Sequence, residues 1–449
     1  MVELLAGGAR MRLARQRWFD PRNLQDNISP DGGSADSPQV ALNVNGDAVI
    51  VWRQSDGSNS QIFRSEYRNG SWADPVGLSD NISPDGQSAL FAPQVALNDN
   101  GEAVIVWSQS DGMNTHIFRS EYRNGSWSDP VDLSDNISPD GTDADSPQVA
   151  LNDNGDAVIV WSQSDGMNTH IFRSEYRNGS WKDPVGLSDN ISPGLQEASP
   201  PQVALNDDGE AVIVWASEGA ISQVFRSEYR NGSWADPAHS LDNISPDGQP
   251  TFSPQVDLNN NGEAVIVWWQ SDGSNLQIFR SEYRDGSWAD PVGLSDNISP
   301  GLQHAISPQV ALNDNGEAVI VWESSGAIEQ IYRSEYRNGS WTDPGNSFDN
   351  ISPDGTDAND PQVALNDNGD AVIVWRQRDM TTQIFRSEYR NGSWTDPTGL
   401  SDNISPDGLD ANVPQVALSD NGDAVIVWYQ GHEDGTNHQI FRSEFRFGF

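Results

Sequence analysis

The sequence predicts an all-β fold, a single β-propeller of eight four-stranded antiparallel blades. Three observations predict it. The motif Ala-Val-Ile-Val-Trp recurs eight times at spacings of 53 to 55 residues, a period typical of propeller blades and other long repeats. Asn-Gly or Asp-Gly pairs separate short apolar segments within the copies, which is a strong signal for β-hairpins. No segment shows the 3.6-residue periodicity of an amphipathic helix.

The second copy shows the strands of one predicted blade. Residues 93–98 (PQVALN) form a first strand, and residues 102–109 (EAVIVWSQ), apolar on both sides, form a second strand buried on both faces. A third strand covers residues 115–123 (THIFRSEYR). The fourth covers residues 126–134 (SWSDPVDLS), where Pro130 suits an outer edge strand because no ladder N–H is needed there. Four antiparallel strands joined by tight turns make one blade.

The two ends of the sequence predict how the ring closes. The last copy stops at Phe449, just after its third strand, and lacks the Gly-Ser-Trp segment that begins the fourth strand elsewhere. Residues 17–21 (RWFDP) match that missing strand. We therefore expect the N-terminal segment to complete the eighth blade, so that residues 18–449 form one propeller domain. Residues 1–17 form an extension that we expect to be poorly ordered.

The composition excludes several classes of function. The chain has 449 residues, with 66 acidic and 25 basic side chains and a net charge of −41. Such a surface repels phosphate backbones and anionic lipid headgroups, so we expect no nucleic-acid partner. The sequence has no cysteine, and therefore no disulfide and no thiolate metal site. No apolar run approaches the roughly 18 residues of a membrane span, so we expect no membrane insertion, and we expect a monomer.

The repeated charged and aromatic residues are interpreted as structural. Nearly every copy carries Ile-Phe-Arg-Ser-Glu-Tyr-Arg, in which strand alternation puts both Arg residues and the Glu on one face. Because the copies are so alike, we favour a charge ladder between neighbouring blades, with Arg stacked on Trp, over anion capture. The two Trp residues of each blade are likewise assigned to packing between blades.

A second repeated segment leaves calcium binding open. In residues 80–86 (DNISPDG), Asn, Ser and Asp at alternate positions before Gly resemble the start of a calcium loop. No Glu stands at the twelfth position, where Ala92 is found, so an Asx-turn is the favoured interpretation. Ca²⁺ is the one cofactor under consideration, and in two copies its candidate ligands are Asn81, Ser83, Asp85, Asn136, Ser138 and Asp140.

The copies differ mostly at the second-to-third turns and the crossovers, while the other turns are nearly constant, and two positions show this difference. One directly follows the repeated Trp, and the other lies two residues before the repeated Pro-Gln. We expect both near the face that carries the second-to-third turns and the blade-to-blade crossovers, called the varied face below. Such loops commonly carry binding, although unconstrained loops also drift. The candidate ligand-binding residues from these positions are Arg53, Phe91, Phe252, Trp269, Glu323, Arg376 and Tyr429.

The pattern PQVALNDNGEAVIVWSQSDG followed by IFRSEYRNGSW resembles a class of bacterial repeat propellers whose blades are likened to those of sialidases. The resemblance covers residues 18–449, and sialidase-like architecture implies glycan recognition. Two departures stand against sialidase activity. In residues 120–127 (SEYRNGSW), Tyr and Asn occupy the diagnostic places of the Asp-box Ser-x-Asp-x-Gly-x-x-Trp. The Arg, Tyr, Glu and Asp residues that a sialidase needs in one asymmetric cluster occur here as eight similar sets.

Three functions are compatible with the sequence. The leading hypothesis is a non-enzymatic module that binds glycans or cell surfaces, and the second is a protein-interaction scaffold that uses the varied face. A sialidase-like hydrolase or lyase comes last, because the six His residues show neither metal spacing nor a triad. Asn-Gly-Ser sequons in tight hairpins, such as residues 69–71, favour a bacterial protein. The resemblance implies secretion or display at the cell surface, although no clear signal peptide is recognisable.

Overall fold

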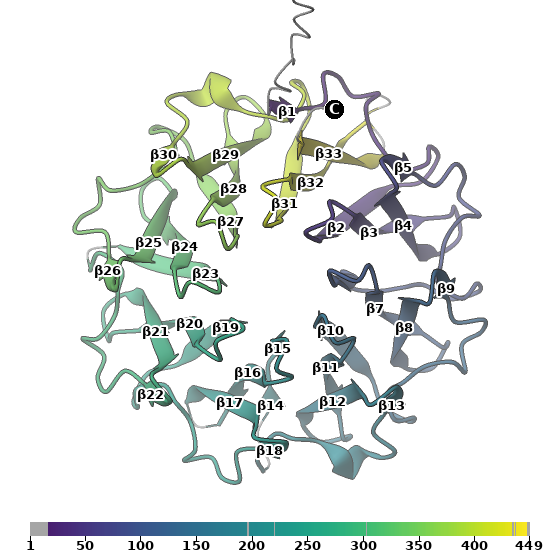
Figure 1. Ribbon diagram of the computed structural model, residues 1–449, viewed down its shortest axis with the longest axis horizontal. Coiled ribbons are helices and arrows are strands. Elements are labelled where there is room, and N and C mark those ends of the chain that lie inside the picture. The colour runs from purple at the N-terminus through teal and green to yellow at the C-terminus, as the bar shows by residue number, and fades with distance from the viewer. Residues whose placement is uncertain are drawn as a thin grey trace, which may run out of the picture.

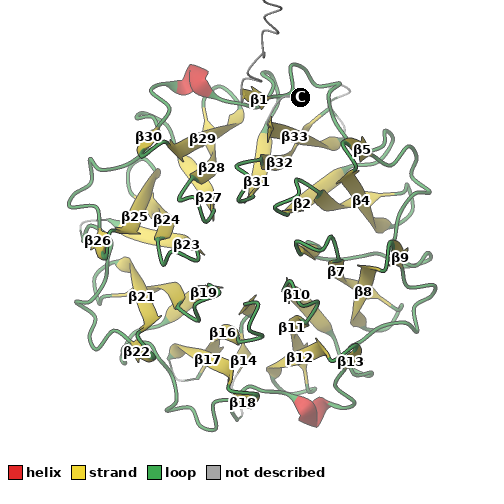
Figure 2. Ribbon diagram, viewed as in Figure 1, coloured by secondary structure: helices red, strands yellow, loops and turns green. Residues whose placement is uncertain are grey.

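A computed structural model describes residues 17–446 of the chain, except 195–196, 220, 302, 433–434 and 436. Eight antiparallel sheets are arranged radially around a central axis (Figure 1), which confirms the predicted eight-bladed β-propeller. Among the described residues, the helical elements are two three-residue 3-10 turns, η1 (Leu187–Asp189) and η2 (Leu400–Asp402) (Figure 2). The described part of the chain contains no helix long and apolar enough to cross a membrane.

Each blade runs from an innermost first strand to a short outermost fourth strand. The first strands are β2 (Ala35–Leu42), β6 (Gln94–Leu97), β10 (Ala144–Leu151), β14 (Glu197–Ala198) with β15 (Gln202–Leu205), β19 (Thr251–Leu258), β23 (His304–Leu312), β27 (Ala358–Leu365) and β31 (Ala411–Leu418). The second strands are β3 (Ala48–Ser55), β7 (Ala103–Ser110), β11 (Ala157–Ser164), β16 (Ala211–Glu218), β20 (Ala264–Ser271), β24 (Ala318–Ser325), β28 (Ala371–Arg378) and β32 (Ala424–Gly431).

The outer half of each blade is equally regular. The third strands are β4 (Ser60–Arg68), β8 (Thr115–Arg123), β12 (Thr169–Arg177), β17 (Ser222–Arg230), β21 (Leu276–Arg284), β25 (Gln330–Arg337), β29 (Thr382–Arg390) and β33 (His438–Arg446). The fourth strands are β5 (Ser71–Ala73), β9 (Ser126–Ser128), β13 (Ser180–Lys182), β18 (Ser233–Ala235), β22 (Ser287–Ala289), β26 (Ser340–Thr342), β30 (Ser393–Thr395) and β1 (Arg17–Phe19).

The fourth strand is shorter than the sequence predicted. Strand β9 ends at Ser128, whereas we expected a strand as far as residue 134. The chain leaves the sheet at Asp129, whose carboxylate accepts hydrogen bonds from Ser120 of the same blade and from Arg64 of the preceding blade. Pro130 follows and cannot donate to a ladder. The tertiary contact of the aspartate therefore decides where the strand ends.

The N-terminal strand closes the ring as predicted. Strand β1 pairs antiparallel with β33, with Trp18 opposite Phe445. The two rings lie 5.4 Å apart, and the carboxylate of Asp20 accepts a hydrogen bond of 2.7 Å from Arg386 of the seventh blade. These contacts repeat those made by the fourth strands of the other blades. Residues 1–16, most of the predicted extension, lie outside the described residues.

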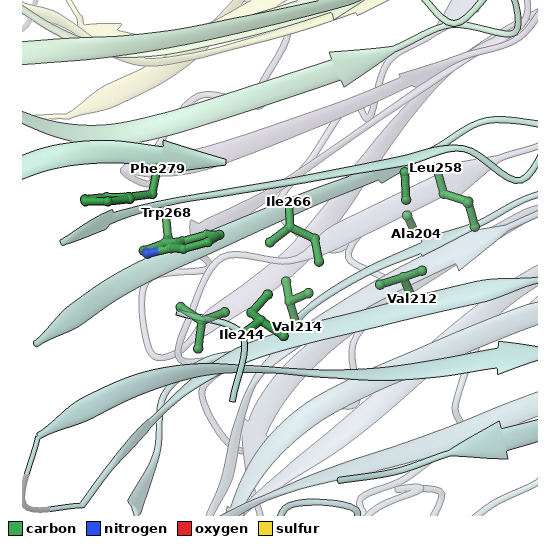
Figure 3. Packing of buried hydrophobic residues seen from close by; sticks show 10 residues of the cluster. Ala204, Val212, Val214, Ile244, Leu258, Ile266, Trp268 and Phe279 are labelled. Carbon is green, nitrogen blue, oxygen red and sulfur yellow. The ribbon is translucent and has the colours of Figure 1, made fainter. Parts of the chain in front are cut away.

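The hydrophobic core lies between the blades. At the seam between the fourth and fifth blades, Val212 and Val214 of β16 pack against Ile266 and Trp268 of β20 (Figure 3). Each second strand is buried on both faces because a blade lies on either side of it. Successive side chains alternate between these two sides. The repeated Trp points toward the preceding blade, so the residue after it points toward the next one.

The repeated Arg, Glu and Trp residues join neighbouring blades. The guanidinium of Arg64 lies 4.1 Å from the ring centre of Trp127 in the next blade. The indole N–H of Trp127 donates a hydrogen bond of 2.7 Å to Glu66, and Glu66 also pairs with Arg64. Equivalent stacking recurs around the ring, which supports the structural role expected from the sequence.

Candidate functional site

The two varied positions of the repeat are direct neighbours across the two innermost strands. In six blades the residue two places before Pro-Gln faces the residue that follows the repeated Trp. The cross-strand pairs are Asp36–Arg53, Asp145–Ser162, Phe252–Trp269, Ile306–Glu323, Asn359–Arg376 and Asn412–Tyr429. The sequence marked both positions as variable, and the fold makes them a single site in each of these blades.

Each pair lies at the seam with the next blade. Arg53 donates a hydrogen bond to the carbonyl of Leu90 in the second blade, and Trp269 packs on the cluster around Trp322 in the sixth blade. Tyr429 of the eighth blade packs on the core cluster of the first. A ligand held by such a pair would therefore contact two blades at once.

A β-bulge shapes the site in the same six blades. The residue after the first varied position has a positive φ, at Ser37 (55°), Ser146 (52°), Ser253 (47°), Ser307 (54°), Asp360 (53°) and Val413 (51°). Non-glycine residues avoid this region, and a β-branched one such as Val413 does so most strongly. Bulges next to binding sites re-aim side chains. The fourth blade, with Pro200 at this position, has a first strand split into β14 and β15, because proline cannot adopt a positive φ.

The varied positions make the ring asymmetric. The residues that follow the repeated Trp are small in three consecutive blades, at Ser108, Ser162 and Ala216. They are large in the five consecutive blades from the fifth around to the first. We call these five residues the arc: Trp269, Glu323, Arg376, Tyr429 and Arg53. Ring closure between the eighth and first blades makes the arc continuous.

The sixth-to-eighth blades carry the polar part of the arc. Glu323 is almost fully buried, with 8% of its surface exposed. Its carboxylate accepts hydrogen bonds from the backbone N–H of Asp360 (2.9 Å) and from the hydroxyl of Ser307 (3.2 Å). Arg376 forms an ion pair with Asp360 at 2.6 Å, and donates a hydrogen bond of 3.1 Å to Asn412. A chain of polar contacts thus links three consecutive blades.

Aromatic side chains and a second ion pair complete the arc. The rings of Phe252 and Trp269 stack with centroids 4.2 Å apart. The ring of Tyr429 lies 5.1 Å from that of His438. Arg53 binds the Asp36 carboxylate through two hydrogen bonds of 3.0 Å each. Apolar ring faces therefore lie in the same surface as charged hydrogen-bonding groups.

Burial and neighbouring charges shift two pKa values in the arc. Burial raises the pKa of Glu323 above its usual value, and the negative charges of Asp360 and Glu329 add to this effect, while hydrogen bonds to the carboxylate oppose it. Burial also raises the pKa of the Tyr429 hydroxyl, with a further increase from Asp36 and a partial offset from Arg376. In both groups burial thus disfavours the charged form relative to the same group in water.

The structure does not bring all seven candidate ligand-binding residues into one site. Phe252 joins the arc through its contact with Trp269. Phe91 is 48% exposed and follows Leu90, but it has no cross-strand partner in β7, because β6 begins only at Gln94. The fold adds Asp360, Glu329 and His438, which the sequence comparison missed. A comparison of the copies could have found these three residues, because most other blades have Ser, Thr or Ala at the same positions.

The crossover segments proposed for calcium are held by hydrogen bonds. The amide of Asn81 donates to the carbonyl of Ser83 (2.8 Å), and the Ser83 hydroxyl accepts from the N–H of Ile62 (2.9 Å). The Asp85 side chain is exposed. In the next crossover Asn136 bonds the carbonyl of Leu133, and Ser138 accepts from Ile117 while Asp140 is exposed. The asparagine bonds are turn contacts, whereas the hydroxyls of Ser83 and Ser138 bond N–H groups on the third strand of the preceding blade. Within the described ranges no group of three or more acidic, His or Cys side chains could hold a metal ion.

The solved structures that resemble this chain share little sequence with it. No family model and no curated protein sequence matches the chain. A Dyadobacter fermentans protein of unknown function is 11% identical with a TM-score of 0.44, over 96% of this chain and 99% of its own. An ulvan lyase of polysaccharide lyase family PL25 is 10% identical with a TM-score of 0.48, over 83% and 95%. A mutant of the Aleuria aurantia lectin is 11% identical with a TM-score of 0.36, over 69% and 94%.

Proposed function

We propose that the chain is a carbohydrate-binding propeller whose binding surface is the arc. The observation that carries the proposal is the continuous run of large side chains in five adjacent blades, opposite three blades with small ones. Aromatic faces pack against the apolar faces of sugar rings, while paired Arg and carboxylate groups bind neighbouring hydroxyls. The arc supplies both through Trp269, Tyr429 and the pair of Arg376 with Asp360.

The wider setting of this proposal is a bacterial protein that is secreted or displayed at the cell surface, with sialidase-like blades. The net charge of −41 supports a neutral or cationic ligand over a nucleic acid or an anionic membrane. Calcium, if it takes part, would act through the crossover segments that contain Asn81 and Asp85. We propose a monomer, because the ring closes on itself through β1 and β33.

A glycan array with matched variants tests the proposal. The protein is applied once with calcium and once with a chelator. Arg376→Ala and Tyr429→Ala should abolish or strongly reduce the signal of the wild type. Ser162→Ala, at the same position in a blade with small residues, should leave the signal unchanged. A blank array in both conditions would retire the glycan hypothesis and direct the search to protein partners of the arc. Signal lost only with chelator would implicate calcium.

One observation favours a second candidate, a glycoside hydrolase or lyase. The buried Glu323 has a raised pKa and lies next to the Arg376–Asp360 pair of the seventh blade, an asymmetric group of the kind that acid–base chemistry uses. Binding is placed first because only 8% of Glu323 is exposed to an incoming substrate. The assay measures reducing ends released from any glycan that binds on the array. Release by the wild type but not by Glu323→Gln would establish enzymatic activity. A glycan that stays intact would exclude that activity for that ligand.

A further inference from the structure

The fourth and sixth blades depart from the other six at the base of the repeated Trp. In six blades a Gln two residues after this Trp accepts its indole N–H, at 2.9–3.2 Å. In the fifth blade the same Gln270 also donates to the carbonyl of Pro246 at 2.7 Å, which anchors the crossover. The corresponding residues in the fourth and sixth blades are Ser217 and Ser324. Serine is too short to reach the indole.

The sixth blade therefore contains a buried donor that lacks an acceptor. Trp322 is fully buried, and its Nε1 has no hydrogen-bond partner within the described part of the chain. Trp322, Ser324 and Tyr332 line a cavity of about 10 Å³, which is near the smallest space that holds one water-sized group. Buried polar groups are nearly always paired in native proteins. The cavity and the unpaired N–H together indicate room for an acceptor that the described residues do not supply.

This small cavity adjoins a larger pocket on the varied face of the sixth blade. The pocket has a volume of about 480 Å³ and shares Gln303 and Tyr332 with the small cavity. Ile328 and Phe348 form its apolar side, with exposed fractions of 40% and 88%. Amide groups of Gln330 and Asn350 form part of its polar side.

Three residues that most blades lack, Tyr332, Ser347 and Phe348, line the pocket. Most blades have a Leu where Ser347 stands, and in the fifth-blade crossover that Leu294 packs on the seam core. Ser347 is too short to fill this space. Tyr332 is Phe in the other seven blades, and its hydroxyl donates a hydrogen bond of 2.8 Å to the Ser347 carbonyl. The next residue, Phe348, is Ser in most blades. A large exposed aromatic thus stands beside a space that other blades fill.

We propose that this pocket binds a neutral monosaccharide unit, one hydroxyl oxygen of which accepts the indole N–H of Trp322. The volume is within the range of about 300–1,000 Å³ for small-molecule sites. A single hydroxyl fits the small cavity, because it replaces one water-sized group. The Oδ1 of Asn350 and the side-chain amide of Gln303 bind the remaining ligand hydroxyls, because the Gln330 amide is already bonded to Asn350, Ser352 and the carbonyls of Glu329 and Thr356. Phe348 and Ile328 contact the C–H face of the ring.

The charges of the pocket select a neutral ligand. Asp354 is the acidic residue in its lining, and the described lining residues of both cavities include no Arg or Lys. His304 in the small cavity already uses its Nδ1 to accept a hydrogen bond from the N–H of Leu276. Uronic, sulfated or phosphorylated sugars would meet a carboxylate with no compensating cation. The site shares no residue with the arc, so the proposal does not depend on what the arc binds.

Titration of purified protein with a panel of neutral methyl glycosides tests the inference. Heat of binding is measured by calorimetry, and the indole N–H signals are followed in ¹H–¹⁵N spectra. Ser324→Gln supplies the acceptor present in six blades and fills the small cavity. Phe348→Ser restores the residue common in other crossovers and removes the exposed ring. Val292→Ser is the matched control, because Val292 is a similarly exposed apolar residue (93% exposed) in the crossover that follows the fifth blade. Arg376→Ala tests whether the arc takes part in binding.

The expected result is binding of at least one glycoside with a shift of a single indole signal. Both pocket variants should weaken that binding tenfold or more, since each removes a buried hydrogen bond or a stacking face. Val292→Ser and Arg376→Ala should leave it unchanged. The inference would be overturned if Ser324→Gln and Phe348→Ser bound the glycoside as tightly as the wild type does. It would also be overturned if no neutral glycoside bound, or if the matching uronic acid bound more tightly. Binding lost only in Arg376→Ala would place the ligand at the arc instead.

Discussion

Asp257 on the innermost strand of the fifth blade should make the protein less stable as the pH rises. The other seven blades have Ala at this position. The Asp257 carboxylate accepts hydrogen bonds from the N–H groups of Leu258 (2.9 Å) and Leu312 (2.8 Å). Burial nevertheless raises its pKa from 3.8 to about 6, and the charge of Asp314 adds to the increase. The loss of hydration therefore outweighs the two hydrogen bonds.

The sign and size follow from proton linkage. Because the folded-state pKa lies above the unfolded value, the folded protein holds this proton more tightly and loses stability as pH rises through the interval from 3.8 to about 6. At about 1.4 kcal/mol per pH unit, the full cost above pH 7 is at most about 3 kcal/mol. The side chain keeps partial exposure to water, so screening lowers this figure to about 2 kcal/mol.

Asp257→Asn and Asp257→Ala test the argument in thermal scans between pH 5 and 8. This range avoids the pI of about 4.1, where the protein carries little net charge. The stability advantage of each variant over the wild type should grow by about 1 kcal/mol across the range. With an unfolding entropy of about 2.1 cal/mol/K per residue, that is a change of about 1 °C in the Tm difference. Packing effects of the substitutions cancel because they do not depend on pH. A Tm difference that is constant, or that grows toward pH 5, would refute the reasoning.

Three further substitutions probe the scaffold by calorimetry. Ser217→Gln gives the buried N–H of Trp215 an acceptor and should stabilise the protein by about 1–2 kcal/mol, whereas a lower Tm would mean that the blade cannot admit the longer side chain. Trp18→Ala removes a contact of the closing strand and should lower the free energy of unfolding by about 3 kcal/mol or more. Trp127→Ala, the equivalent change in an internal blade, is the control. An equal loss of stability in both variants would show that the closing strand adds no stability beyond that of an ordinary fourth strand. Val413→Gly relieves a β-branched residue at φ 51° and should raise stability by about 1 kcal/mol, unless the bulge is held without strain.

The repeat pattern predicted most of the fold. Strand order, hairpin turns and ring closure depend on local signals such as Asn-Gly and on a matching pair of chain ends, and these are legible in one sequence. The length of the fourth strand was wrong, because β9 ends where Asp129 bonds to Arg64 of another blade. A contact between residues 65 positions apart leaves no local signal in the sequence.

For the candidate site, the sequence identified variable positions without showing which belong together. Arg53 and Tyr429 are far apart in the chain, and only ring closure makes their blades neighbours. The space beside Trp322 was equally hidden, since Ser324, Tyr332 and Ser347 come together only where two crossovers pack against the sixth blade.

The sequence by itself determined the number of blades, the strands within each, the closing strand and the positions at which blades differ, because each follows from periodicity and short-range turn chemistry. The tertiary structure decided that five large residues form one arc, that Glu323, Asp360 and Arg376 share a polar network, and that a pocket of the sixth blade adjoins the buried N–H of Trp322. These properties depend on distances between segments that the chain brings together only when the ring closes and the blades pack.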